Sequence, residues 1–70
     1  MKAQEKVMLL NSMVNSMSNF KNDESKVGKD IYNNYKVRCE ELISELKADG
    51  VSEVINPHFK NAVQSFKYWN

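Results

Sequence analysis

The chain has 70 residues, enough for one domain, and its formal net charge at pH 7 is +1. A charge this small excludes a general electrostatic attraction to nucleic acids or to membrane surfaces. Its one cysteine excludes an internal disulfide, and one cysteine with one histidine cannot fill a structural zinc site, so we expect no cofactor.

Small size also limits stability. A chain of about 60 residues buries only about 60% of its unfolded surface, and its hydrophobic gain then barely exceeds the entropy lost on folding. With disulfide and zinc excluded, we expect the chain to gain stability from another protein chain, as a homo-oligomer or as a subunit of a hetero-complex.

Origin and location follow from composition. An unpaired cysteine suits a reducing compartment. The apolar run from Val7 to Leu10 is too short for a signal peptide or a membrane span. We expect a cytoplasmic protein without membrane contact. The basic residues are lysines apart from Arg38, and asparagine is abundant; both residue types have A-rich codons, which indicates an AT-rich bacterial or phage genome.

The first apolar segment covers residues 3–20 and has the period of an α-helix. Its apolar residues fall in one arc at about 100° per residue, and Met8 lies outside this arc. Lys6 lies inside it, where its stem can cover apolar surface while the ammonium stays in water. The opposite face is polar and almost uncharged, so we expect this helix to depend on packing. The arc contains Ala3, Val7, Leu9, Leu10, Met13, Val14, Met17 and Phe20.

The second segment predicts a long helix over residues 24–48, with Asn22 or Asp23 as its N-cap. Its apolar arc is wider than a coiled-coil seam, so we expect this helix to contact two neighbours. Gly50 is suited to the left-handed position that ends a helix, and Val51 to the apolar contact after it. The arc contains Val27, Ile31, Tyr32, Tyr35, Cys39, Leu42, Ile43 and Leu46.

The third segment begins at Asn56, a good N-cap, followed by Pro57, which suits the first helical turn. Apolar residues then recur at spacings of three and four and predict a helix over residues 57–69. We expect the connector before it to turn Val54 and Ile55 inward. The apolar stripe contains Phe59, Ala62, Val63, Phe66 and Trp69.

Together these segments predict one all-α domain over residues 1–70, a small three-helix arrangement with a long central helix. A helix of about 25 residues is about 37 Å long, which is long for so small a domain. The part of it that the other helices leave uncovered needs a second chain, so we expect the protein to dimerise.

Residues that could support catalysis are few. Cys39 lies in the apolar arc, where cysteine usually acts as a small hydrophobic residue, and His58 is expected on the surface. The carboxylates Glu40, Glu41 and Glu45 are expected on a solvated face, and no glycine-rich phosphate loop is present. We therefore expect a protein that is not an enzyme.

A helix-turn-helix is one route to DNA binding, and the glycine of "ADGVSEVINPHF" is the candidate for its turn. Leu46 stands where such a turn needs a small residue, and Pro57 interrupts the second helix. The fit is therefore poor.

The preferred hypothesis is a small interaction or regulatory protein, such as a bacterial or phage accessory factor, that binds and modulates another protein. Terminal aromatic residues are good interface anchors, and flexible methionines adapt to irregular partners. The expected partner-binding residues are Met8, Met13, Met17, Tyr68 and Trp69.

The alternative hypothesis is a nucleic-acid-binding regulator in which dimerisation aligns basic residues that are dispersed in one chain. Lysines and arginines neutralise phosphates, and this term makes such binding weaken as salt rises. The expected residues are Lys36, Arg38, Lys60 and Lys67.

Overall fold

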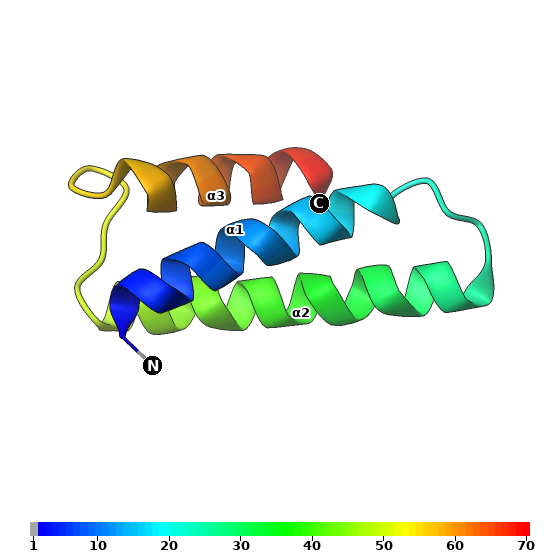
Figure 1. The fold of residues 1–70 in the computed structure, drawn as a ribbon, viewed down its shortest axis with the longest axis horizontal. Helices are drawn as coiled ribbons and strands as arrows, with labels where there is room; N and C mark the ends of the chain where they lie inside the picture. The colour runs from blue at the N-terminus through cyan, green and yellow to red at the C-terminus, as the bar shows by residue number, and fades with distance from the viewer. Residues whose placement is uncertain (1) are drawn as a thin grey trace.

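The computed structural model describes residues 2–70 and consists of three α-helices, α1 (Ala3–Asn19), α2 (Lys26–Ala48) and α3 (Pro57–Trp69), as Figure 1 shows. The described residues contain no strand. This confirms the all-α class and the three-helix arrangement. The longest dimension of the molecule is 38 Å, and α2 runs along it (Figure 1).

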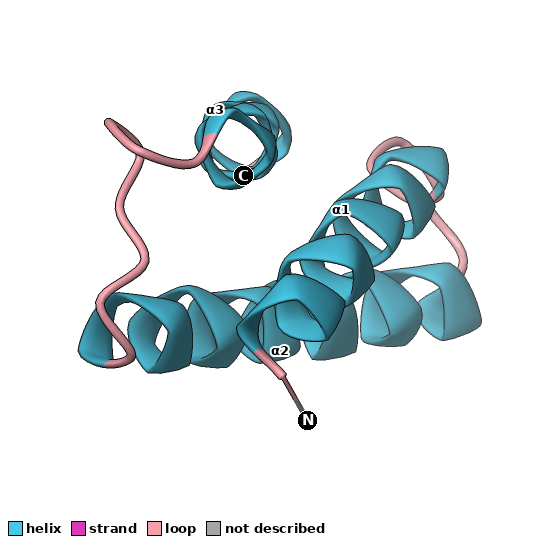
Figure 2. Ribbon diagram, turned by 60° about the vertical axis from the view of Figure 1, so that its left-hand side comes forward, coloured by secondary structure: helices cyan, strands magenta, loops and turns pink. Residues whose placement is uncertain are grey.

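The helix with two neighbours is α1. It packs against both α2 and α3, whereas α2 and α3 have few contacts with each other. Figure 2 shows α1 crossing on one side of the other two helices. The long α2, predicted to contact two neighbours, packs mainly against α1 and touches α3 only at a few points, such as the hydrogen bond from Tyr32 to Trp69. Buried apolar residues recur along α1 from Val7 to Met17, so this helix can pack against both neighbours.

One hydrophobic core joins the three helices. The stripe predicted for the third helix is confirmed, with Trp69 partly buried at its end. The side chains that lie fully in the core are Val7, Leu10, Val14, Met17, Cys39, Leu42, Leu46, Phe59, Ala62, Val63 and Phe66.

The start of α2 differs from the prediction, because the N-cap is Ser25. Its hydroxyl accepts a hydrogen bond from the Gly28 backbone N–H at 3.0 Å. Asp23 instead accepts from the Ser25 N–H at 2.8 Å and so forms the turn before the helix. A Cβ at Gly28 would lie 2.2 Å from the Asp23 carboxyl carbon, so the glycine makes room for this turn.

The end of α2 and the start of α3 follow the prediction. Gly50 adopts a positive φ of 89°, and the N–H groups of Gly50 and Val51 donate to the carbonyls of Lys47 and Leu46 at 3.1 and 2.9 Å. This pair of bonds is a Schellman motif. At the next helix, the Asn56 side chain accepts from the Phe59 N–H at 3.0 Å.

The connector between α2 and α3 is where the prediction fails most clearly. Val54 and Ile55 are 93% and 73% exposed, not turned inward. The Asn56 N–H donates to the Ser52 carbonyl at 3.0 Å, which closes a local turn. The local turn places both side chains on the surface, away from the core.

Three polar contacts fix the helices relative to one another. The Lys6 ammonium lies 3.2 Å from the Asp49 carboxylate and joins the start of α1 to the end of α2. The Tyr32 hydroxyl donates to the Trp69 carbonyl and joins α2 to the end of α3. The Asn11 amide donates to the His58 carbonyl at 3.3 Å and joins α1 to the start of α3.

Among the described residues, no helix combines the length and the apolar character that crossing a lipid bilayer requires.

Candidate interaction surfaces

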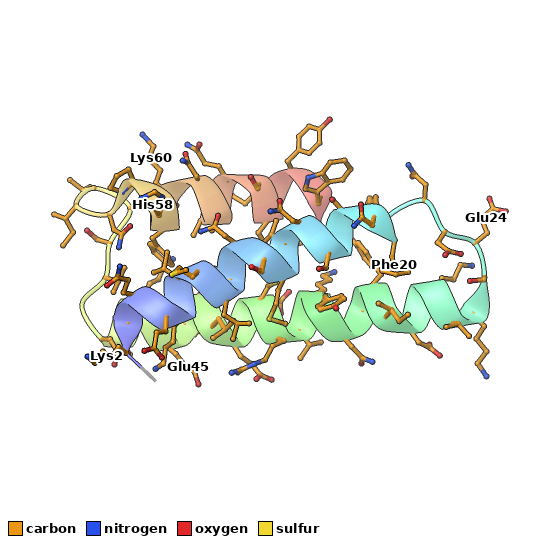
Figure 3. All side chains as sticks on the ribbon, in the orientation of Figure 1. Lys2, Phe20, Glu24, Glu45, His58 and Lys60 are labelled. Atoms are coloured by element: carbon orange, nitrogen blue, oxygen red, sulfur yellow. The ribbon has the colours of Figure 1, made fainter. Side chains whose placement is uncertain are left out.

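The thiol of Cys39 is inaccessible. Its side chain is fully buried among α1, α2 and α3 core residues. Burial, with a further contribution from the Glu40 carboxylate, raises the pKa of the thiol to about 11. A protonated, buried thiol is a poor nucleophile. His58 is exposed at the start of α3 (Figure 3), so it is not buried beside this sulfur.

Residues 2–70 contain no group of three or more His, Cys, Asp or Glu side chains placed to hold a metal ion. Within the same range, every buried side-chain nitrogen and oxygen has a hydrogen-bond partner. The features that remain as candidate functional sites are therefore surface grooves between the helices.

The first groove lies between α1 and α2 and has a volume of about 490 Å³. Met13 and Phe20 form its α1 side, and Ile31 and Tyr35 its α2 side. Figure 3 shows Phe20 between the end of α1 and α2. Val27, four residues before Ile31, is on the same face of α2 and is 68% exposed. We call these five residues the α1/α2 apolar face.

The charge on this face is small. Arg38 is the one charged residue that lines the groove. Its guanidinium lies 3.2 Å from the Glu41 carboxylate and 3.8 Å from that of Glu45. Asn34 is the other polar lining residue. The surface is thus apolar, with its single cation already paired within the chain.

The second groove lies between α1 and the start of α3 and has a volume of about 470 Å³. Met8 lines it and is 64% exposed. The remaining lining is largely polar and includes Gln4, Asn11, Ser12, Asn56 and His58. The exposed Val54 and Ile55 precede Asn56 in the chain.

The residues predicted to bind a protein partner do not share one surface. Met13 lies in the α1/α2 groove, and Met8 in the α1/α3 groove. Met17 is fully buried in the core, so its side chain is not available to a partner. Tyr68 is 77% exposed on α3, and its ring lies edge-on to that of the partly buried Trp69, with 4.9 Å between the ring centres.

The residues predicted to bind nucleic acid divide into two groups. Lys67 lines a third groove, between α2 and α3, and Lys60 lies two helical turns before it on the same face of α3. Lys36 lies on the face of α2 that borders this groove, since it is four residues before Glu40 and seven before Ile43. Arg38 lies on the other flank of α2, where it is paired with carboxylates.

Sequence reasoning missed the exposure of Val27 and the partial exposure of Phe20, Ile31 and Tyr35, because it assigned all four to the apolar arcs of the helices. Val27 lies at the edge of its arc, and Phe20 and Ile31 lie next to the edges of theirs; these positions were the available signal. It also missed Lys47, which lines the α2/α3 groove.

Comparisons with protein family models, with curated proteins and with solved structures gave no match.

Proposed function

We propose that the protein is a small, non-enzymatic interaction module that self-associates through the α1/α2 apolar face and binds and modulates another protein. One observation carries the first part of this proposal: apolar side chains from two helices surround a groove whose only charged lining residue is paired within the chain. Uncharged apolar surface is suited to contact with a second copy, because like charges do not then meet across the two-fold axis.

The size of the core supports the same proposal. Among residues 2–70, eleven side chains form the core, while Val27, which borders the groove, remains 68% exposed. Figure 1 shows the first turns of α2 extending beyond α1, beside the loop that joins the two helices. A second copy placed on this face would cover the uncovered part of α2.

The non-enzymatic part of the proposal is supported by the buried, protonated Cys39. The lone thiol also suits a reducing cytoplasm. The lysine- and asparagine-rich composition supports an accessory factor from an AT-rich bacterial or phage genome.

The test of self-association uses two exposed valines of the same helix. Val27 belongs to the α1/α2 apolar face, and Val37 is 54% exposed on the outer side of α2. We expect Val27→Arg to weaken association at least tenfold, about 1.4 kcal/mol, because it places a charge in an apolar contact. Sedimentation velocity over a concentration series measures this change.

The matched control is Val37→Arg, which adds the same charge to the same helix and should leave association unchanged. Equal effects of the two substitutions would contradict the assignment of this face.

A further inference from the structure

The groove between α2 and α3 has an apolar floor that α1 does not cover. It has a volume of about 360 Å³, and its floor consists of Ile43, Val63 and Phe66. None of its lining residues belongs to α1. Figure 2 shows α1 on one side of the α2/α3 pair and no helix on the other side. The α2/α3 pair is therefore covered by α1 on one side, and its seam on the other side is open.

Lysines flank this seam on both edges. On α2, Lys36, Glu40, Ile43 and Lys47 recur at spacings of four, three and four residues, which places them on one face of the helix. On α3, Lys60, Val63 and Lys67 recur at spacings of three and four. Lys47 and Lys67 line the groove itself, whereas Lys60 projects away from the other two helices (Figure 3) and lies at the outer edge of the seam.

This arrangement separates charge across the molecule. The four lysines and Glu40 carry a formal charge of +3, so the rest of a chain whose total is +1 carries −2. Within residues 2–70, none of these four lysines forms a salt bridge. Their ammonium groups are therefore available to anionic groups of a ligand.

The chemistry of the seam favours one kind of ligand. A second copy of the chain would bring lysines against lysines, which is repulsive. Single-stranded nucleic acid needs exposed aromatic rings on which bases stack. Phe66 in the floor is only 6% exposed, and Tyr68 is not among the lining residues. An amphipathic helix with acidic flanks matches both the apolar floor and the lysine edges.

We infer that the α2/α3 seam binds an acidic amphipathic helix of a partner protein, which lies opposite α1 as a fourth helix. Apolar residues of that helix contact mainly Ile43, which is half-buried, above the nearly buried Val63 and Phe66. Its flanking carboxylates pair with Lys47 and Lys67, which line the groove, and with Lys36 and Lys60 on the outer edges of the seam. From Lys36 to Lys47 the seam is about 17 Å long at 1.5 Å per residue, which corresponds to about three turns of the bound helix. This inference goes beyond the self-association proposed above and uses the opposite flank of α2.

The test uses designed 14-residue helical peptides as probes and the full-length protein. One peptide has leucines at helical spacing with glutamates on both flanks, and its control has glutamines in place of the glutamates. We expect the acidic peptide to bind and to shift the amide NMR signals of Ile43, Val63 and Lys67. The glutamine peptide should bind at least about tenfold more weakly, because it lacks the charge pairs.

Two double variants locate the site. Lys47→Glu with Lys67→Glu should weaken binding of the acidic peptide at least about tenfold. Lys2→Glu with Lys26→Glu makes the same change in net charge at exposed lysines outside the seam and should change binding less than about threefold. Ile43→Arg keeps the lysines but blocks the floor, and it should also abolish binding. Circular dichroism of each variant verifies that the helices are intact, and sedimentation reports self-association separately.

Equal binding of the acidic peptide to both double variants would overturn the inference. So would an undiminished affinity of Ile43→Arg, or tighter binding of a 12-nucleotide DNA strand than of the peptide at the same salt concentration. The last result would assign the lysines to nucleic acid.

Discussion

At the scale of single residues, Cys39 shows how burial, the larger of two causes, changes the acidity of a thiol. Its side chain has no exposed surface, and burial raises the pKa of the thiol to about 11 from an ordinary value of 9.0. The folded protein therefore holds this proton more tightly than the unfolded chain does. The stabilisation that follows is fully present below pH 9.0 and is lost as the pH rises toward about 11.

This predicts a pH-dependent difference between the wild-type protein and Cys39→Ala. The wild type should lose about 2 kcal/mol more unfolding free energy than the variant between pH 9.0 and about 11. The variant is the reference because it shares every other titratable group with the wild type. Urea unfolding at several pH values measures the difference, and parallel pH profiles would contradict the assigned pKa.

The binding activities should not depend on this thiol. We expect Cys39→Ala to keep self-association and peptide binding within about twofold at neutral pH, at a cost in stability of about 1 kcal/mol from the lost packing. A large loss of either activity, measured by sedimentation and by NMR titration in a variant that is still folded, would show that Cys39 has a role beyond the core.

The N-cap of α2 is a feature that the sequence pattern alone could not determine. Asn22, Asp23 and Ser25 all have side chains that can cap a helix, and the local pattern does not choose among them. The choice depends on Gly28, whose missing side chain leaves space for the Asp23 carboxylate, and on the hydrogen bond from the Ser25 N–H to Asp23. Hydrogen bonding with Ser25 also lowers the pKa of Asp23. The Ser25 side chain makes the larger contribution and its backbone the smaller one.

At the scale of elements, the helix ends that sequence predicts well are those with backbone requirements. Gly50 takes a left-handed conformation that other residues rarely adopt, and Pro57 is acceptable only in the first turn of a helix. Val54 and Ile55 carry no such requirement. Their apolar character predicts burial, but the closed turn between Ser52 and Asn56 leaves them on the surface.

Substitution of Gly50 tests the Schellman motif. No atom lies within 4 Å of a Cβ added at this position, so Gly50→Ala creates no clash and its cost is purely conformational. We expect a loss of about 1 kcal/mol, which lowers the melting temperature by about 4–8 °C in a chain of this size. Thermal unfolding followed by circular dichroism measures the shift.

The control for this prediction is Gly50→Asn, since asparagine adopts the left-handed conformation more readily than alanine. It should lose clearly less stability than Gly50→Ala. An equal loss for both would show that the positive φ is not the source of the effect.

At the scale of the whole molecule, the apolar pattern predicted three helices but not their order in space. The arcs of the first two helices are both broad, so periodicity alone did not show that α1 rather than α2 lies against both neighbours. That choice follows from the shape of the packed core, in which Val7, Leu10, Val14 and Met17 are all buried. The candidate surfaces depend on this choice, because α1 covers one side of the α2/α3 pair and leaves the lysine-flanked seam open on the other.

The total exposed area does not by itself require a partner. It is 4770 Å², close to the value of about 4,500 Å² expected for a folded monomer of this mass. The positions of the apolar and charged residues on the surface are what favour binding to other chains. Apolar residues meet at the α1/α2 groove, and unpaired lysines flank the seam on the other side of α2.

The central claim is that the α1/α2 apolar face joins two copies of the chain. Sedimentation equilibrium of the wild-type protein over a micromolar concentration series, at low and at high salt, tests it most directly. We predict that the mass rises with concentration toward twice that of the 8.1 kDa chain and that salt has little effect, because the contact is apolar. A mass that stays at 8.1 kDa throughout the series would contradict the claim.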